Sequence, residues 1–569
     1  MARLAQVVGR LPGPAFARLG RAIFSRSHKK LLAAARDPNA TQTARLLSIL
    51  HRERETEFGR THGFERVASV EDYRKAVPIR TYDGFEPFIA RMLAGEKNVL
   101  LSEEPFFYAR SSGTTGAPKH IPVTPTYVRE YRVPRRAWAR AVTQAFPGVL
   151  RGKIFGVHSP KIEGRTPTGV PYGSITVALG GSPELGDRVD RFGVEAVPRR
   201  VFLIEDYEQR YYTALRMAAQ ENVSLAAAVN PSTLVLLAKK LDEHADRLAH
   251  DLEDGTLDGI ERLDPVLREE LTARMREAPD QAERIRASKI KRGFVLPTDV
   301  WPEIAGLVCW KGGSAPFYLA QLGKLFPGRE ALDYGFLATE GGFSIPLSTD
   351  GAKGVVSVLG HFLEFIPEEE MDLGKVDGAR LAGELEVGRT YRVIVTASNG
   401  LYRYDINDVV QCVGHYERTA EIVFLHKGGN MISITGEKIG EAHVVEAVRR
   451  VCAAHAFGLV GFSVSAELTD PPRYVLGVEL ERDAPDPSLL ELLARVDKAL
   501  GEVNLEYRTK RDSLRLGSPV LALLQRGAYS RERARRVAAG APDGQVKPPH
   551  LLRDPARLEA LGVIRRLGP

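Results

Sequence analysis

Residues 111–119 read Ser-Ser-Gly-Thr-Thr-Gly-Ala-Pro-Lys. An aromatic run at 106–109 precedes this stretch and a short extended piece at 121–124 follows it, so the stretch is predicted to be a loop between two strands. Gly113 and Gly116 allow the backbone to turn and to approach a ligand closely. Backbone N–H groups, hydroxyl groups and one ammonium group are all hydrogen-bond donors, and such a cluster suits a polyphosphate. The side-chain donors are Ser111, Ser112, Thr114, Thr115 and Lys119.

The spacing differs from that of a Walker A loop, which has four residues between its glycines and then Gly-Lys-Ser/Thr. Here two residues separate Gly113 from Gly116, and Lys119 follows two residues later. The alternative is a polar surface loop that binds nothing, because glycine, serine and threonine are common in turns. The rest of the chain has to decide between these interpretations.

The overall composition is ordinary for a soluble globular protein. The chain has 569 residues, of which 44% are apolar and 27% charged, and one large and one small domain are compatible with that length. The net charge of +7 mildly favours anionic small molecules and does not require nucleic acid. Three distant cysteines predict neither a disulfide framework nor a zinc site, and they favour a reducing, cytoplasmic setting.

No apolar run approaches the roughly 18 residues that a membrane span needs. The basic N-terminal segment, residues 1–30, is expected to form an amphipathic helix that docks on the body of the protein. Arg10 interrupts any apolar core that a signal peptide would have.

The middle of the chain predicts an α/β fold. A strand at 307–310 is followed by Lys-Gly-Gly-Ser at 311–314, a helix at 316–326, a strand at 332–337, and Ala-Thr-Glu-Gly-Gly at 338–342. Strand, helix and strand in turn indicate an α/β sheet, in which ligands bind beyond the carboxyl ends of the strands. Both glycine-bearing turns follow such ends.

Other segments predict a long helix, the domain boundary and the fold of the C-terminal part. Asn230 and Pro231 are a good helix start, and 234–252 reads as one long helix. The polar link at 426–430 is the predicted domain boundary, after a β-rich segment at 384–397 and a strand at 422–425. The helices and strands beyond the link, at 441–455, 459–465, 474–480 and 487–500, predict a small α+β domain. The predicted domains are therefore residues 1–426 and 427–569.

These pieces, in this order, resemble the adenylate-forming superfamily and, more closely, the auxin-responsive Gretchen Hagen family of acyl acid amido synthetases. The motifs that carry the resemblance span residues from about 105 to 550, most of the chain, and their joint order and spacing is the strong signal. They are 111–119, Asn-Pro-Ser-Thr-Leu at 230–234, Gly-Gly-Ser at 312–314, Phe-Leu-Ala-Thr-Glu at 336–340, Glu-Phe-Ile-Pro at 364–367, Gly-Leu-Tyr-Arg-Tyr at 400–404 with Asp408, Gly-Glu-Lys at 436–438, and Gln-Val-Lys at 545–547.

The resemblance implies a large adenylate-forming domain and a small mobile domain that rotates over the active site, with 427–429 as the hinge. It also implies a reaction in two steps, in which a carboxylic acid attacks ATP to give acyl-AMP and an amine, typically of an amino acid, then takes the acyl group. Making an anhydride of two anions requires hydrogen-bond donors and a metal, so ATP and Mg²⁺ are the implied cofactors.

The resemblance also implies roles for single residues. Residues 111–119 would hold the ATP phosphates, with Gly312 and Gly313 also at the nucleotide. Phe336 falls where the family has a tyrosine that stacks on adenine, Thr339 would donate to the α-phosphate, and Glu340 would bind Mg²⁺.

The resemblance implies roles for three more residues, and two of these roles have a structural alternative. Asp408 would accept from the ribose hydroxyls, and Asn407 replaces a glycine of the family while still tolerating a left-handed backbone. Arg403 is a candidate nucleotide ligand or, alternatively, the structural partner of a carboxylate. Lys547 is the candidate catalytic lysine of the small domain, with an exposed tail lysine as the alternative.

Three other functions stay open at this point. A ligase that uses coenzyme A as acceptor differs only in its product, and a non-catalytic sensor could share the scaffold. Nucleic-acid binding rests only on the mild positive charge. The expected partners are a small carboxylic acid and an amino acid or other amine, with no nucleic acid, no stable membrane association and a monomeric state.

Overall fold

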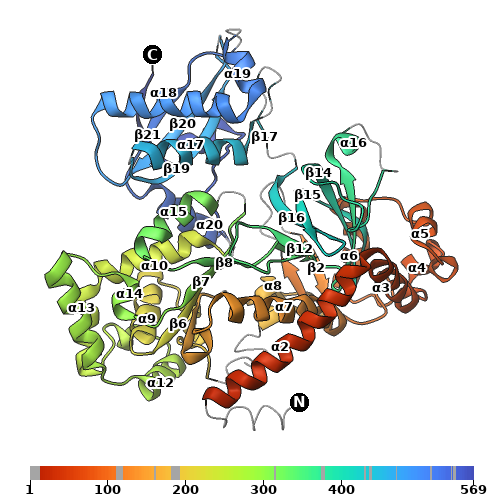
Figure 1. Ribbon diagram of the computed structural model, residues 1–569, viewed down its shortest axis with the longest axis horizontal. Coiled ribbons are helices and arrows are strands. Elements are labelled where there is room, and N and C mark those ends of the chain that lie inside the picture. Colours follow the sequence, from red (N-terminus) through yellow and green to blue (C-terminus); the bar gives the residue numbers. More distant parts are fainter. Residues whose placement is uncertain are drawn as a thin grey trace. The chain divides into compact units, whose positions relative to one another are not determined.

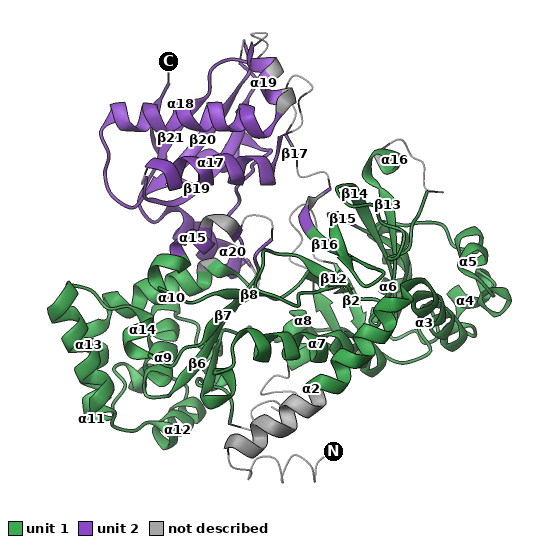
Figure 2. Cartoon of the chain, viewed as in Figure 1, with its two compact units in different colours: residues 1–310, 322–406, 410–423 green, residues 311–321, 407–409, 424–569 purple. Residues whose placement is uncertain are grey.

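The structure is a computed structural model. It describes residues 13–110, 119–158, 162–180, 193–312, 315–372, 378–428, 431–432, 434, 437, 439–455, 457–469, 471–512, 516–539, 541 and 546–568. Figure 2 shows two compact units, in green and purple. Unit 1 comprises Met1–Trp310, Leu322–Ile406 and Val410–Val423, and unit 2 comprises Lys311–Gln321, Asn407–Val409 and Phe424–Pro569. The predicted domain division at residue 426 and the predicted rotation stay predictions.

A parallel sheet forms one part of unit 1, and its strands lie in the order β3-β6-β7-β8. The strands are β3 (Lys153–Gly156), β6 (Val223–Ala227), β7 (Gly306–Cys309) and β8 (Ala331–Asp333). Helices lie between successive strands in the chain, among them α9 (Tyr207–Ala219) and α10 (Pro231–Glu243), as Figure 1 shows. Val308, Leu332 and Phe146 belong to the apolar core against this sheet. The α/β prediction is confirmed.

Two larger sheets also lie mainly in unit 1. Four strands lie in the order β2-β1-β5-β4 and six in the order β11-β12-β16-β15-β14-β13. The bounds of the four are β1 (Phe107–Arg110), β2 (His120–Val123), β4 (Ile162–Arg165) and β5 (Pro171–Gly173). The bounds of the six are β11 (Ser344–Ile345), β12 (Gly354–Val356), β13 (Phe362–Pro367), β14 (Thr390–Ala397), β15 (Leu401–Tyr416) and β16 (Thr419–Lys427).

The N-terminal part of unit 1 is helical. Helix α2 (Gly13–Arg36) packs on α7 (Pro125–Ala145), where Leu31 joins a cluster with Ala137 and Ile345. This confirms the docked N-terminal helix for the residues from Gly13 onward. The helices that follow are α3 (Pro38–Glu53), α4 (Glu57–Thr61), α5 (Val70–Ala76) and α6 (Glu86–Leu93).

Unit 2 contains the small α+β domain that the sequence predicts. Its sheet has the order β19-β20-β21-β22, with β19 (Leu459–Glu467), β20 (Arg473–Leu480), β21 (Val520–Leu524) and β22 (Val563–Leu567). Helices α17 (Glu441–His455) and α18 (Asp486–Val503) pack on each other. A core of buried side chains, including Val475, Ala522 and Tyr529, joins the sheet to α20 (Ala528–Ala538) and α21 (Pro555–Glu559).

Three predicted elements differ from the structure. The helix expected at 234–252 is two helices, because the backbone leaves helical geometry at His244 (φ −96°, ψ 12°) and α11 (Ala245–Asp254) then packs on α13 (Pro279–Arg292). The strand expected at 332–337 ends at Asp333, because the Asp333 carboxylate accepts a hydrogen bond from the backbone of Gly335, whose φ of +90° breaks the strand. The strand expected at 422–425 runs on through Lys427, so two residues of the predicted link are extended backbone.

Candidate active site

The hydroxyl-rich stretch connects two paired strands. Strands β1 and β2 are antiparallel, and Arg110 lies opposite His120 at the end where the stretch leaves the pair. This confirms the predicted strands on either side of the loop. Ser111, Ser112, Gly113, Thr114, Thr115, Gly116 and also Gly313 lie outside the described residues. Their binding of phosphate stays a prediction.

Lys119, at the end of that stretch, lies beside two tyrosine rings. Its ammonium group lies 5.3 Å from the centre of the Tyr82 ring and 6.0 Å from that of Tyr404, and it donates to the Tyr404 hydroxyl over 3.3 Å. Tyr82 is fixed in turn by His120, whose backbone N–H donates to the Tyr82 hydroxyl over 2.9 Å. Two tyrosines thus orient the cation without neutralising its charge.

Thr339 and Glu340 form the turn of a short hairpin. Strand β9 (Leu337–Ala338) pairs with β10 (Gly341–Gly342), so these two residues are the whole connection. Glu340 is only 7% exposed, yet no residue in the described part of the chain donates a hydrogen bond to its carboxylate or forms an ion pair with it. A buried carboxylate without a partner is unfavourable unless a cation joins it.

The charge of Glu340 acts on two tyrosines of the same unit. Burial raises the pKa of Tyr82 to about 12, and the negative charge of Glu340 adds to this rise. Burial and the same carboxylate also raise the pKa of Tyr131, again to about 12. The carboxylate therefore lies within electrostatic reach of the ring over which the Lys119 ammonium sits. Unit 1 thus holds both charged groups of the predicted site, Lys119 over the Tyr82 ring and the buried carboxylate of Glu340.

Phe336 precedes this turn and is almost fully buried. Its ring centre lies 4.6 Å from that of Phe343, with 34° between the planes. Phe343 therefore occupies one side of the Phe336 ring. Stacking on adenine stays a prediction.

Arg403 is paired with a carboxylate inside unit 1. Its guanidinium group donates to the Glu364 carboxylate over 3.0 and 3.4 Å and to the backbone carbonyls of Arg74 and Val77 over 3.2 and 3.0 Å. With only 4% of the residue exposed, its donors are used inside unit 1. These contacts favour the carboxylate partnership that the sequence left open, and a role of Arg403 as a nucleotide ligand stays a prediction.

The remaining predicted residues belong to unit 2. Asn407 adopts the expected left-handed backbone, with φ of +61°, and its side chain donates to the Gly428 carbonyl over 2.6 Å. Asp408 follows it and is buried, and Gly312 is buried three residues after β7 ends. Lys547 is half-buried, and its carbonyl accepts a hydrogen bond from Arg536 over 3.3 Å. The ligand roles of Asp408, Gly312 and Lys547 stay predictions.

Sequence reasoning missed the side chains that surround the Glu340 turn. Tyr127 is fully buried and donates to the Thr339 carbonyl over 2.9 Å, and Asn399 donates to the Glu340 carbonyl over 3.2 Å. One signal was available: Thr124 is of a residue type that favours helix caps, and it does cap this helix by accepting from the Tyr127 N–H, which fixes Tyr127 in the first turn. Asn399 immediately precedes a quoted motif at Gly400 but has no local signal of its own.

No helix in the described part of the chain is long and apolar enough to cross a membrane. Family models match most of the sequence: the GH3 family N-terminal domain at residues 27–331, the GH3 family central domain at 354–427 and the GH3 family C-terminal domain at 442–556.

Individual proteins agree with the family models. The indole-3-acetic acid-amido synthetase GH3.3 of Arabidopsis thaliana is 25% identical over 90% of this chain and 89% of its own length. The jasmonoyl–L-amino acid synthetase JAR4 of Nicotiana attenuata is 23% identical over 93% of each chain. The solved structure of the GH3.15 acyl acid amido synthetase superposes with a TM-score of 0.82 at 20% identity, covering 95% of this chain and 96% of that one, which confirms the expected fold. With three family domains matched in order along its length, the chain is a member of the GH3 family.

Proposed function

We propose that this protein is an ATP-dependent acyl acid amido synthetase, which activates a carboxylic acid as acyl-AMP and transfers the acyl group to an amine, most simply that of an amino acid. Membership of the family supports the reaction class, because the relatives above are named as synthetases that join acids to amino acids. The observation that carries the proposal is the buried Glu340 carboxylate, which has no hydrogen-bond or ion-pair partner in the described part of the chain, in the same unit as the Lys119 ammonium over the Tyr82 ring.

The donor set fits Mg²⁺ and a nucleotide. A hard carboxylate oxygen is the kind of ligand that Mg²⁺ accepts, and this ion uses one or two carboxylates together with phosphate oxygens. Glu340 would hold it, and the bound ion would neutralise charge on the phosphates. Lys119 would contribute a second positive charge to the same phosphates, and Thr339 a hydroxyl donor.

In the first step the acid oxygen bonds to the α-phosphorus of ATP, and the bond to pyrophosphate breaks. In the second step the amine nitrogen bonds to the acyl carbon, the bond to AMP breaks, and the amine gives up a proton. Both steps build negative charge on phosphate oxygens, which fixed donors stabilise. Lys547 is the proposed donor from unit 2, and Asp408 is the proposed acceptor for the ribose hydroxyls.

We also propose a cytoplasmic location, a monomeric state and small-molecule partners only. Cys309, Cys412 and Cys452 are free thiols, as in proteins of reducing compartments.

The test combines the purified protein with Mg-ATP and a panel of aromatic and alkyl acids, with and without pooled amino acids. Pyrophosphate release and product mass are measured together. We expect acid-dependent pyrophosphate and an amide product, both reduced roughly 10²-fold or more in Glu340→Gln. Glu369→Gln is the matched control, since that glutamate is 57% exposed and pairs with Arg389 at the surface.

The other outcomes separate the alternatives. A product that forms only with coenzyme A would replace the proposal by an acyl-CoA ligase. Measurable ATP binding without pyrophosphate for any acid would replace it by a binding protein. Equal activity of Glu340→Gln and the unchanged protein would remove Glu340 from the proposed site.

A further inference from the structure

The hairpin turn that carries Glu340 is held from its backbone. Three consecutive carbonyl groups, one at the end of β9 and two in the turn, each accept a hydrogen bond from a side chain elsewhere in unit 1. Tyr131 donates to Ala338 over 3.5 Å, Tyr127 to Thr339 over 2.9 Å, and Asn399 to Glu340 over 3.2 Å. We infer that Tyr127 and Asn399 are positioning residues, which hold the Thr339–Glu340 turn so that the Glu340 carboxylate is presented to the metal–nucleotide complex. This inference rests on the proposed role of Glu340.

The Glu340 side chain cannot fix its own position. Its carboxylate has no hydrogen bond or ion pair within the described ranges, so its place depends on the packing around it and on the backbone of the turn. That turn is only two residues long, and each of its carbonyls has one of the two donors. A change of either donor should therefore move the carboxylate itself.

The two donors are themselves rigid. Asn399 and Tyr127 are both 0% exposed. The Asn399 side-chain oxygen accepts from the Leu401 N–H over 3.3 Å, which fixes which end of the amide faces Glu340. The Tyr127 ring stacks on His361, with ring centres 5.5 Å apart and 20° between the planes. Neither donor has room to follow a displaced turn.

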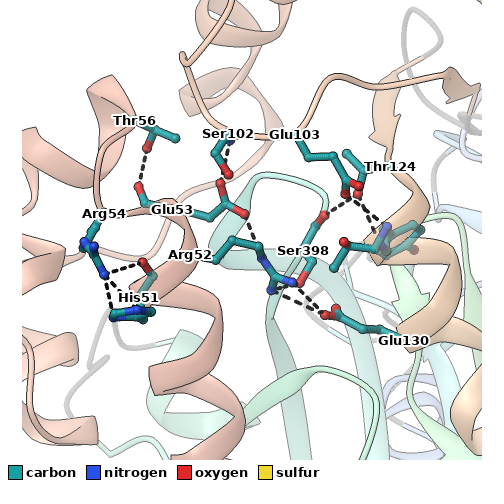
Figure 3. A network of polar contacts seen from close by, with 12 residues as sticks. His51, Arg52, Glu53, Arg54, Thr56, Ser102, Glu103, Thr124, Glu130 and Ser398 are labelled. Carbon is teal, nitrogen blue, oxygen red and sulfur yellow. Dashed lines mark hydrogen bonds and ion pairs between the residues drawn. The ribbon is translucent and has the colours of Figure 1, made fainter.

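A network of charges holds the neighbouring residue, Ser398, as Figure 3 shows. Arg52 donates to the Ser398 hydroxyl over 2.9 Å, and the Thr124 hydroxyl donates to the Ser398 carbonyl over 3.3 Å. Glu130 accepts from Arg52 over 3.4 Å and also pairs with Arg45. Thr124 caps the helix that carries Tyr127, and Ser398 immediately precedes Asn399. The same network therefore holds the backbone next to both donors.

The test uses two substitutions that keep shape and remove a donor, Tyr127→Phe and Asn399→Asp. Tyr73→Phe is the matched control, because the Tyr73 hydroxyl is as deeply buried, hydrogen-bonds Thr396 over 2.8 Å and does not touch the turn. Binding of Mn²⁺ is measured by electron paramagnetic resonance in the presence of α,β-methylene-ATP, a nucleotide that cannot release pyrophosphate. Thermal unfolding of every variant is recorded alongside.

We expect the dissociation constant for Mn²⁺ to rise roughly tenfold or more in both variants, because groups that orient a metal ligand carry effects of this size. Tyr73→Phe should lower the unfolding temperature as much as Tyr127→Phe and leave Mn²⁺ binding unchanged. Mn²⁺ binding that follows unfolding temperature across all three variants would overturn the inference, since a merely structural role predicts that correlation.

Glu340→Gln separates this inference from the proposed function. If Glu340→Gln weakens Mn²⁺ binding but Tyr127→Phe and Asn399→Asp do not, the positioning role is wrong while the metal site stands. If Glu340→Gln leaves Mn²⁺ binding unchanged, the metal role of Glu340 is wrong and the positioning role falls with it.

Discussion

Arg403 and Glu364 form a buried ion pair, with 3.0 Å between Nε and Oε2 and with 5% and 1% of their side chains exposed. Arg74 donates to the other oxygen of the same carboxylate over 2.8 Å. Arg403 also has a positive φ of 46°, which is uncommon for a residue with a side chain. The Glu364 carboxylate of strand β13 thus links Arg403, at an unusual backbone position in β15, to Arg74 of helix α5. Arg403 therefore has a structural role.

Arg403→Ala should lower the free energy of unfolding by about 3–5 kcal/mol, because it leaves the Glu364 carboxylate buried with only one partner. Denaturant unfolding measures this. The control is Lys75→Ala, whose pair with Glu71 is exposed at 72% and 76% and should leave the free energy of unfolding nearly unchanged. A folded, equally stable Arg403→Ala protein with weakened ATP binding would restore the ligand interpretation of Arg403.

Gly341 lies directly after Glu340, and the space beside it is already filled. A Cβ atom there would lie 2.7 Å from Cδ2 of His361, a fully buried ring. We therefore expect Gly341→Ala to lower the free energy of unfolding by about 1–3 kcal/mol, as overpacking does. Gly323→Ala, in helix α15 (Ala315–Leu325), meets no atom within 4 Å and should be neutral or stabilising. Similar stability changes in both variants would contradict the packing argument.

The sequence predicted the parts of the fold that local patterns determine. The start of α10 at Pro231, the helix Glu441–His455 and the strands around residues 111–119 follow from caps, periodicity and β-rich runs within a few residues. The break at His244 was missed because it depends on how α11 packs on α13, which no local pattern records.

In the candidate site, too, the sequence predicts the residues in short motifs and misses the contacts between distant residues. Glu340, Thr339 and Lys119 stand in short motifs and could be named from the sequence. Tyr127 lies 212 residues from the carbonyl it binds, and Asn399 lies 59 residues from its own. Partnerships across such separations come from the topology of unit 1, so a single sequence without a structure does not reveal them.

Lys119 should matter for catalysis more than for stability. Lys119→Met removes the charge but keeps a side chain of similar length over Tyr82. Because the ammonium contacts only aromatic rings and one hydroxyl in the described part of unit 1, the free energy of unfolding should change by less than about 1 kcal/mol. If Lys119 stabilises developing phosphate charge, kcat/KM for ATP should fall roughly 10²-fold. The control is Lys75→Met on the surface, and unchanged kcat/KM in Lys119→Met would refute the phosphate role.

His361 predicts how stability depends on pH. The ring is 0% exposed, neither of its nitrogens has a hydrogen-bond partner in the described structure, and it faces Tyr127, Tyr131 and the charge of Arg45. Burial, with Arg45 adding to it, lowers the pKa of His361 from 6.5 to about 3. The native state therefore keeps the ring neutral over a range in which the unfolded chain takes up a proton.

The sign follows from proton linkage. The stabilisation is fully present above the unfolded pKa of 6.5 and is lost progressively as the pH falls from 6.5 towards 3, because the unfolded state binds the extra proton there. The contribution of His361 to the slope should approach about 1.4 kcal/mol per pH unit in that range. Urea unfolding between about pH 5 and pH 8 should show this slope in the unchanged protein and a clearly smaller one in His361→Leu. His250→Gln, at a side chain that is 71% exposed, should keep the full slope. If His361→Leu shows the same slope as the unchanged protein, His361 is already protonated in the folded state. The ring that stacks on Tyr127 would then be charged and not neutral.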